Sequence, residues 1–476
     1  MEFPTIQFVY FALITLTIAW LLNQTRTVQK SFLLAASYFF AWKWQPMFLA
    51  MLILSSVMNW ALGKALVALK GHRRRKSVLA LGLVANLGIL GFFKYYGFFI
   101  EGLGPLLAFL DLEVHLPLIE VIAPFGISFY TFQSIAYLVD TYRDKAAQPK
   151  TLLDFLLFIA FFPKFGAGPI CRSHELLPQI MAPAPKEIPE LSRAIALITA
   201  GLFKKMIIGT YIASHLTTDA FLAPSNYSSL ELLLAVFAYT AQVYVDFSGY
   251  TDLARGVSLL FGFDLPENFN DPYRATDIGD FWRRWHITFS TWLSEYIYFP
   301  LGGSRVGRLR CYFNLMVTFL ACGLWHGPAW GYVIWGGLHG LGLSIYKASL
   351  EIRRALGIDT RALRPFWVLA GGWFLTFTFC AFTRIFFKAS DVPTALEFFG
   401  GLFAFTARGS GLDLGVLFLT LFTIGMNFFG RRVWDAFIRW HESIPILVRP
   451  VAWVGIVLTL FILKPHGMAA TIYFSF

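Results

Sequence analysis

His326 is the residue whose type and surroundings best suit it to acid–base chemistry. It follows the apolar run Cys311–Trp325 and precedes Gly327 and Pro328. Because proline disfavours a helical conformation in the residue before it, a helix through the apolar run should end at or near His326. Apolar surroundings keep an imidazole neutral, and a neutral imidazole can accept the proton of a hydroxyl group that attacks an ester or thioester. The alternative is a core histidine hydrogen-bonded to a backbone carbonyl.

The position of His326 along its predicted helix adds to this interpretation. The last basic residue before the apolar run is Arg310, so 326 − 310 gives 16 residues, or about 24 Å of helix. Gly323, Gly327 and Gly331 recur at every fourth position, which permits a neighbouring helix to approach closely. His326 is therefore expected deep between packed helices.

Other polar residues in apolar surroundings are weaker candidates. His286 lies in the segment Trp285–Thr288, where an interfacial histidine flanked by arginines is the simpler interpretation. Asp252 and Arg255 are three residues apart and can pair on one helix face, which favours a structural ion pair. Structural roles are also favoured for two further residues, His339 and Arg384.

Several kinds of site are excluded by spacing. Gly63-Lys64 lacks the remaining residues of a phosphate-binding loop, and no cysteine or histidine cluster has the spacing of a metal site, so we predict no metal. His215 and Asp219 are one residue too close for the H-x4-D pattern of soluble glycerolipid acyltransferases. Cys171 beside Arg172 is either an acyl-carrying thiolate or, as we favour, a small apolar filler.

The composition identifies the elements that must hold these residues. Of 476 residues, 57% are hydrophobic and only 14% are charged, too few to cover a surface in water. We predict an all-α polytopic membrane protein with about 10–13 transmembrane or re-entrant helices. The predicted spans are 6–22, 31–41, 47–62, 78–93, 95–110, 118–139, 192–213, 230–248, 311–326, 329–348, 366–387, 411–428 and 450–464.

Basic residues predict the orientation of these helices. The 39 Lys and Arg residues outnumber the 28 Asp and Glu residues and occur in short clusters between apolar runs, as cytoplasmic loops do. The clusters are His72–Lys76, Arg353 to Arg364, and Arg431 to Arg449. They place the N-terminus outside. A further basic cluster, Arg305, Arg308 and Arg310, should mark the cytoplasmic end of the 311–326 helix, so that His326 lies toward the outer face.

Residues 264–310 do not fit a simple span. They are too polar for one transmembrane helix, yet they contain the aromatic and basic run Phe281–His286. Amphipathic interfacial helices have this composition. Because the segment lies between spans, we expect it to line the protein interior or an aqueous entrance.

The chain resembles the membrane-bound O-acyltransferase (MBOAT) family, most closely the branch of the bacterial alginate O-acetyltransferase subunit. The resemblance runs from about residue 1 to Ile472–Phe476. The segments that carry it are Phe281–Leu293, Tyr298–Gly303, Gly323–Gly327, Gly126–Gln133, Tyr137–Asp140, Gly168–Ile170 and Val245–Tyr250.

The resemblance implies a fold, a reaction and a site. The fold would be a single domain of residues 1–476, a ring of helices around a central funnel, with N-terminal helices at 1–115, a core at 116–390 and C-terminal helices at 391–476. His326 matches the family's catalytic histidine and His286 its second polar position. As substrate- or donor-binding residues we predict Arg283, Arg284, Trp285, Trp325 and Asp246.

The predicted reaction is acetyl transfer from a cytosolic thioester to an exported polysaccharide such as alginate. Acetyl-CoA would be the co-substrate, with no bound cofactor, and the protein would lie in the bacterial inner membrane. The acetyl group would pass directly to a sugar or through periplasmic partner proteins, and nucleic acid is not expected as a partner. Two alternatives are D-alanyl transfer to teichoic acid and, from another class, a multi-span transporter or flippase.

Overall fold

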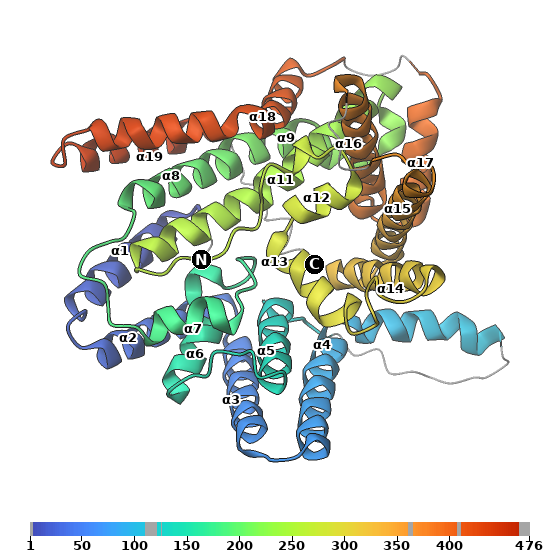
Figure 1. Ribbon diagram of the computed structural model, residues 1–476. Coiled ribbons are helices and arrows are strands. Elements are labelled where there is room, and N and C mark those ends of the chain that lie inside the picture. The colour runs from blue at the N-terminus through green and yellow to red at the C-terminus, as the bar shows by residue number, and fades with distance from the viewer. Residues whose placement is uncertain (1–2, 110–120, 125, 360–364, 407–410, 466–476) are drawn as a thin grey trace. The chain divides into compact units, whose positions relative to one another are not determined.

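The computed structural model describes residues 3–109, 121–124, 126–359, 365–406 and 411–465 (Figure 1). Every regular element in these ranges is a helix, and the only β pairing within them is an isolated bridge between Phe269 and Trp285. This confirms the predicted all-α class. The chain divides into two compact units, one of Met1–Ala194 with Ala254–Pro266 and one of Ile195–Leu253 with Glu267–Phe476.

Unit 1 is formed mainly by the N-terminal helices. Its elements are α1 (Ile6–Leu21), α2 (Arg26–Trp44), α3 (Pro46–Ala68), α4 (His72–Phe109), α5 (Ile127–Tyr142), α6 (Leu152–Ala160), η1 (Phe162–Lys164) and α7 (Ser173–Met181). Helices α3, α4 and α5 pack side by side (Figure 1).

Unit 2 holds all of the predicted site residues. Two of its helices, α8 (Leu191–Leu202) and α11 (Ser229–Leu260), begin or end in unit 1. Its remaining elements are η2 (Phe203–Gly209), α9 (Thr210–Ile212), η3 (Ala213–Thr217), α10 (Thr218–Leu222), η4 (Pro224–Asn226), η5 (Pro272–Arg274), α12 (Ile278–Arg284), α13 (Ile287–Leu293), η6 (Ser294–Tyr298), α14 (Arg308–His326), α15 (Trp330–Ala355), α16 (Phe366–Lys388), α17 (Val392–Phe403), α18 (Leu414–Ser443) and α19 (Arg449–Leu463).

Several of these helices can cross a membrane. Among the described residues, six continuous helical segments are long and apolar enough to do so, and three shorter apolar helices accompany them. The six are Pro46–Ala68, His72–Leu103, Leu191–Leu222, Ser229–Leu260, Phe366–Lys388 and Leu414–Ser443. The chain is therefore a multi-pass membrane protein. The count of 10–13 and the ring with its funnel stay predictions.

The predicted boundaries differ from the structure in the first third of the chain. Residues 78–93 and 95–110 were predicted as two spans, but residues 78–93 and 95–109 belong to the single helix α4, and residue 110 lies outside the described residues. Lysine at position 94 is a good helix former and interrupts no backbone hydrogen bond, so the helix continues through it. Part of the predicted span 118–139, the basic residues Arg361 and Arg364, and the motif Ile472–Phe476 lie outside the described residues.

The aromatic segment within 264–310 folds inward. It forms the short elements η5, α12, α13 and η6, and the side chain of Asp277 caps α12 by accepting a hydrogen bond from the Asp280 backbone N–H at 2.7 Å. Six aromatic side chains of this segment are buried within unit 2: Tyr273, Phe281, Trp282, Trp285, Phe289 and Trp292. This agrees with the expectation that the segment lines the interior.

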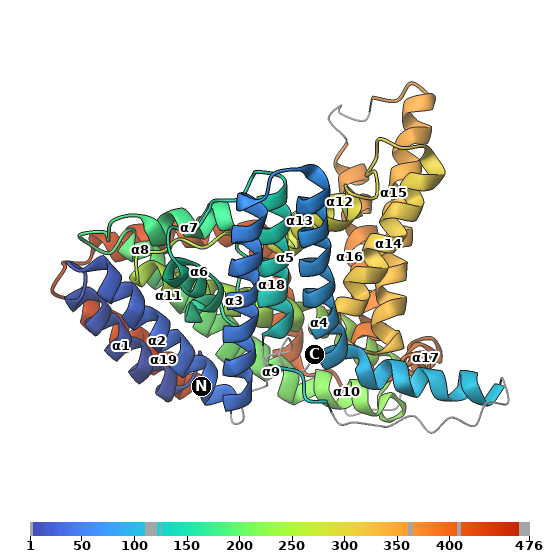
Figure 2. The ribbon, with the colours of Figure 1, turned by 90° about the horizontal axis from the view of Figure 1, so that it is seen from below.

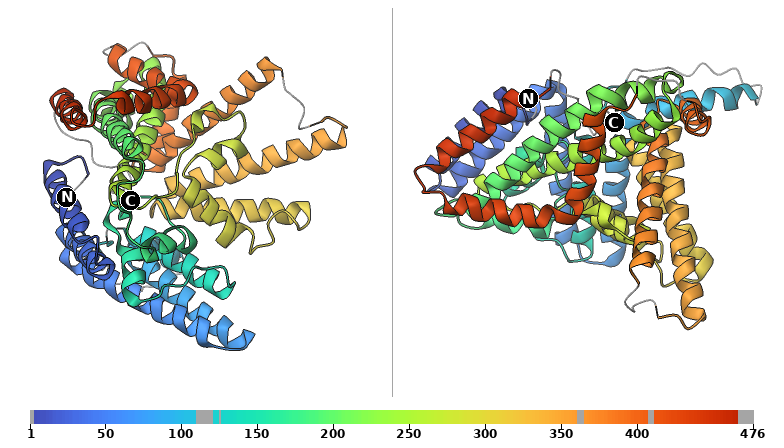
Figure 3. Two further views of the ribbon diagram at one scale, coloured as in Figure 1. Left: turned by 60° about the vertical axis from the view of Figure 1, so that its left-hand side comes forward. Right: turned by 90° about the horizontal axis from the view of Figure 1, so that it is seen from above.

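Helices α14, α15 and α16 run side by side (Figure 2), and Figure 3 gives two further views of them. Glycines allow the close approach, because a Cβ atom at Gly336 of α15 would meet the carbonyl of Phe319 and the Cα of Gly323 in α14. At the other end of the pair, Lys347 Nζ of α15 donates to Cys311 Sγ of α14 at 2.9 Å. Helix α14 is thus held to α15 near both of its ends.

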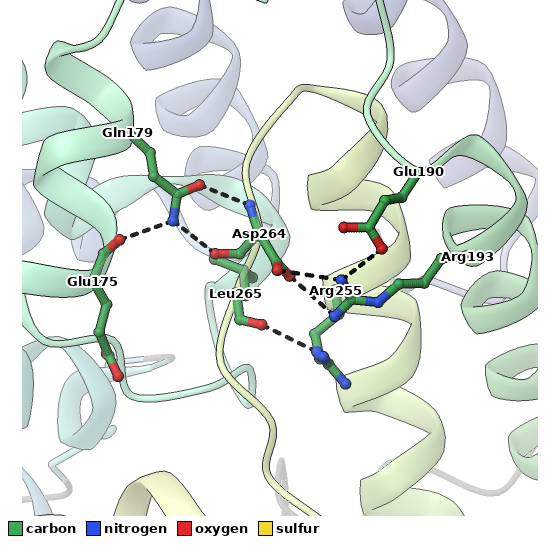
Figure 4. A network of polar contacts seen from close by, with 7 residues as sticks. All are labelled: Glu175, Gln179, Glu190, Arg193, Arg255, Asp264 and Leu265. Atoms are coloured by element: carbon green, nitrogen blue, oxygen red, sulfur yellow. Dashed lines mark hydrogen bonds and ion pairs between the residues drawn. The ribbon is translucent and has the colours of Figure 1, made fainter. Parts of the chain in front are cut away.

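A polar network in unit 1 fixes the loop that follows α11 (Figure 4). Arg193 pairs with Glu190 at 3.0 Å and with Asp264 at 3.3 Å. Gln179 bonds both the backbone N–H and the carbonyl of Asp264, and Arg255 Nε donates to the carbonyl of Leu265 at 3.1 Å. These bonds anchor the segment that leads from α11 toward the aromatic elements of unit 2.

Candidate active site

His326 is the last residue of α14. The helix ends there because Gly327 is extended, with φ 175° and ψ 164°, and Pro328 follows. The side chain is 3% exposed. The centroid of its ring lies 4.6 Å from that of Trp325, 5.0 Å from Trp335 of α15 and 4.8 Å from Phe387 of α16. The structure confirms that His326 sits at a helix end, buried among closely packed helices.

His286 adopts a backbone conformation that is uncommon outside glycine. Its φ of 43° and ψ of 56° are left-handed, and it directly precedes α13. Backbone hydrogen bonds to the segment 268–270 hold this geometry. Ile287 N donates to the carbonyl of Asn268 at 2.9 Å, and Asn270 N donates to the carbonyl of Arg284 at 3.0 Å. Strained residues of this kind are concentrated at functional sites.

The two histidines share two aromatic neighbours. The ring of His286 lies 5.0 Å from Phe289 and 5.8 Å from Trp325, and His326 lies 6.4 Å and 4.6 Å from the same rings. Phe247 of α11 packs on His286 at 4.6 Å. We call these residues, with Trp335 and Phe387, the histidine cage: Phe247, His286, Phe289, Trp325, His326, Trp335 and Phe387.

The cage favours the neutral form of imidazole. Its walls are aromatic rings, and His286 is 1% exposed. Burial lowers the pKa of His286 well below its usual value, because an apolar environment disfavours the charged ring. Chemically, the cage can hold a neutral base against aromatic rings.

Trp285 and Arg384 lie against one another next to the cage. Trp285 packs on Phe269 at 5.2 Å and on Phe281 at 5.5 Å, and the guanidinium of Arg384 lies 4.8 Å from the centroid of its ring. Phe269 in turn contacts Phe247 of the cage at 5.1 Å. No sequence pattern indicated that Arg384 of α16 would meet Trp285.

Arg283 and Arg284 turn toward a carboxylate. Arg284 Nε lies 2.8 Å from Asp280 Oδ2 and Arg283 Nη2 lies 3.5 Å from Oδ1 of the same residue. The side chain of Arg283 is 67% exposed. Attraction of the donor by both arginines stays a prediction. They would act from outside the cage.

Asp246 forms a buried ion pair. Lys205 of η2 lies 2.6 Å from Asp246 Oδ1, and the two side chains are 4% and 7% exposed. The next lysine, Lys204, pairs at 2.6 Å with Asp252, so the predicted pair of Asp252 with Arg255 is wrong. The adjacent lysines inside an apolar stretch were the signal that could have located these partners. Asp246 directly precedes Phe247, which belongs to the cage.

His339 and Cys171 have structural surroundings. His339 Nδ1 accepts from Trp282 Nε1 at 3.2 Å, so its proton is on Nε2, which lies 3.1 Å from Thr383 Oγ1. Both ring nitrogens are therefore engaged. In unit 1, burial raises the pKa of the Cys171 thiol to about 12, which opposes a thiolate role.

Comparison with known proteins identifies the family of the chain. Residues 108–390 match the membrane-bound O-acyltransferase family, MBOAT. The chain is 37% identical over 404 residues to a peptidoglycan O-acetyltransferase of Helicobacter pylori, covering 78% of this chain and 73% of that protein. It is 37% identical over 412 residues to the probable alginate O-acetylase AlgI of Pseudomonas putida, covering 84% and 81%.

A third relative is more distant. A teichoic acid D-alanyltransferase of Streptococcus thermophilus is 29% identical over 275 residues, covering 53% of this chain and 65% of that protein.

The helical fold and these matches define a multi-pass membrane enzyme that transfers acyl groups. The chain belongs to the membrane-bound O-acyltransferase family. It is thus an O-acyltransferase and not a transporter, as the resemblance in sequence predicted.

Proposed function

We propose that this protein is an inner-membrane O-acetyltransferase that moves an acetyl group from a cytosolic thioester, acetyl-CoA, to an exported polysaccharide. The observation that carries the proposal is the histidine cage, which buries two histidines against the same two aromatic rings. Two relatives are named a peptidoglycan O-acetyltransferase and a probable alginate O-acetylase. Their names support acetyl as the transferred group and a polysaccharide as the acceptor.

The reaction needs one base near the acceptor hydroxyl. Neutral His326 accepts the hydroxyl proton as the oxygen attacks the acetyl carbonyl carbon. The carbonyl electron pair moves onto its oxygen, and when the tetrahedral intermediate collapses, the carbon–sulfur bond breaks. The imidazolium then returns the proton to the departing thiolate. His286, held by its fixed backbone, orients the acetyl group.

The sidedness of the proposed reaction follows from α14. The helix begins at Arg308, in the basic cluster predicted to face the cytoplasm, and ends at His326. An acceptor from the outer side would therefore meet the base near the end of the helix, while the donor would come from the start. The acceptor oxygen belongs either to a sugar or to a periplasmic partner that passes acetyl onward.

Acetyl is favoured over D-alanyl by the extent of similarity. The O-acetyl relatives cover 78% and 84% of this chain, whereas the D-alanyltransferase covers 53% at lower identity. Mass spectrometry of the modified glycan separates the two groups.

Replacement of His326 by Ala tests the proposal. Cells carrying H326A should lose O-acetyl groups on the exported glycan, because in the proposed mechanism His286 orients the acetyl group and does not accept the proton. In membranes, transfer of radiolabelled acetyl from acetyl-CoA should fall by about 10²–10⁴-fold. His174→Ala, at an exposed histidine of α7, is the matched control and should keep full activity. Normal acetylation by H326A at equal protein level would refute the assignment.

A further inference from the structure

Arg384 is a buried cation in an unusual setting. Its side chain is 5% exposed, and its guanidinium lies over the rings of Trp285, Tyr273 and Phe281 at 4.8, 5.6 and 5.8 Å. Its hydrogen bond within the protein runs from Nη1 to the carbonyl of Cys380, one turn earlier in α16, at 3.3 Å. Within the described part of the chain, no carboxylate lies within ion-pair distance of it.

Such an arrangement leaves a positive charge only partly compensated. Aromatic faces and a carbonyl oxygen present partial negative charge, but a buried arginine is ordinarily paired with an acid. The same unit shows the ordinary solution at Lys205, which is equally buried and contacts the carboxylate of Asp246 at 2.6 Å. The excess charge at Arg384 therefore suits a negative group that is present only during the reaction.

The position of Arg384 links it to the histidine cage. Phe387 lies one turn further along α16 and contacts the ring of His326 at 4.8 Å. Trp285, on which the guanidinium rests, immediately precedes His286. Arg384 therefore shares a helix with one aromatic contact of His326 and rests on the residue that precedes His286.

The position of Arg384 along α16 favours a negative charge that forms at the acyl end of the donor over the negative charges of the donor's phosphates. Arg384 is 18 residues after Phe366, the first residue of α16, or about 27 Å along the helix. That first residue is at the end predicted to face the cytoplasm, where a donor would leave its phosphates.

We propose that Arg384 is an electrostatic element of the active site that stabilises the negative oxygen formed on the acetyl carbon during transfer. This rests on the proposed function. When the acceptor oxygen bonds to that carbon, the carbonyl electron pair becomes a full negative charge on oxygen, and His326 takes the hydroxyl proton. The positive charge of Arg384 lowers the energy of that intermediate, and the negative oxygen in turn compensates the charge of Arg384. Collapse restores the carbonyl and expels the thiolate, which receives the proton.

The test compares three variants of the full chain reconstituted in lipid nanodiscs, with acetyl-CoA as the probe. Arg384→Met removes the charge at similar length, Arg384→Lys keeps the charge, and Lys388→Met removes a neighbouring cation that lies over Tyr239 at 5.6 Å. R384M should lower kcat by about 10²-fold with the KM for acetyl-CoA unchanged, since only the intermediate carries the charge. R384K should restore most of kcat, and K388M should retain it.

Thermal unfolding measured on the same samples separates catalysis from packing. The inference is overturned if folded R384M keeps the wild-type kcat. It is also overturned if R384K loses as much activity as R384M, because Arg384 would then act only as an aromatic clamp. Should R384M not fold, R384K alone decides, by retaining or losing kcat. A wild-type protein that transfers no acetyl from acetyl-CoA defeats the proposed function itself, whereas activity that H326A abolishes and R384M retains defeats only the role of Arg384.

Discussion

Two regions of unit 2 bury charged or titratable side chains in opposite ways. Between η2 and α11, Lys204 and Lys205 each meet a carboxylate at 2.6 Å. We call these the η2–α11 ion pairs. In the histidine cage and at Arg384 beside it, imidazole and guanidinium groups face aromatic rings instead.

The difference separates holding a fold from performing a reaction. A paired buried charge is compensated at all times, so removing one partner leaves the other uncompensated and harms the folded state. A neutral base in an aromatic enclosure contributes little ion-pair energy, but it is ready to take a proton. Substitutions in the η2–α11 ion pairs should therefore affect stability, and substitutions in the cage should affect turnover.

Lys205→Met should produce the largest change. It removes the cation that lies 2.6 Å from the buried carboxylate of Asp246, and breaking a buried ion pair in this way costs about 3–5 kcal/mol of stability. Thermal unfolding in nanodiscs would measure this as a large drop in midpoint, with turnover per folded molecule unchanged. The double variant with Asp246→Leu should recover most of the loss. Equal stability of K205M and the wild type would remove the basis of the comparison.

His286→Ala should produce the next largest change, now in turnover. The acetyl group loses its orienting neighbour, so acetyl transfer should fall by about 10²-fold while the unfolding midpoint moves little. His215→Ala is the control, because His215 is an exposed histidine of η3 whose Nδ1 bonds the carbonyl of Tyr211 at 2.9 Å. If H286A were unstable but fully active when folded, His286 would belong with the structural group.

Gly336→Ala should lower both stability and turnover, because it separates two of the helices that build the cage. The added methyl group would meet the carbonyl of Phe319, and overpacking of this kind costs about 1–3 kcal/mol. The adjacent Gly337→Ala is a matched control, since its methyl group would approach only Leu320 Cδ2 at 3.7 Å. Both variants can be compared by unfolding midpoint and acetyl transfer. Equal behaviour of the two would show that α14 and α15 do not need this close approach.

Lys204→Met should have the smallest effect. Lys204 and Asp252 are 27% and 15% exposed, so solvent screens their pair and its removal should cost about 1 kcal/mol or less. The same unfolding measurement used for K205M applies. A loss as large as that of K205M would mean that burial does not set the strength of these ion pairs.

The sequence predicted much of the fold because the signals are local. Apolar runs located most of the helices, and Pro328 located the end of α14 at His326. The close approach near Gly323 was also expected from spacing, and α14 does pack against Gly336 of α15 there. Where a single lysine was taken as the boundary between two apolar runs, as at Lys94, the predicted boundary was wrong.

The candidate site was only partly predictable, because its contacts join distant segments. His286 and His326 could be named from their motifs, but nothing local indicates that they share Phe289 and Trp325. The partner of Asp246 is Lys205 of η2, 41 residues earlier in the sequence. The partner of Trp285 is Arg384 of α16, 99 residues later. Pairings of this range depend on the tertiary fold.

Helix α14 also places a requirement on the shape of the donor. It is unbroken over 19 residues, and Lys347 and the glycines fix it to α15 near both ends, so it cannot shorten. Under the proposed function, a donor that enters near Arg310 at the start of α14 must deliver its reactive carbon across about 24 Å to the imidazole of His326. A donor whose acyl group is attached through a long, narrow linker can span this distance. A compact acyl phosphate is too short to contact the start of α14 and His326 at the same time.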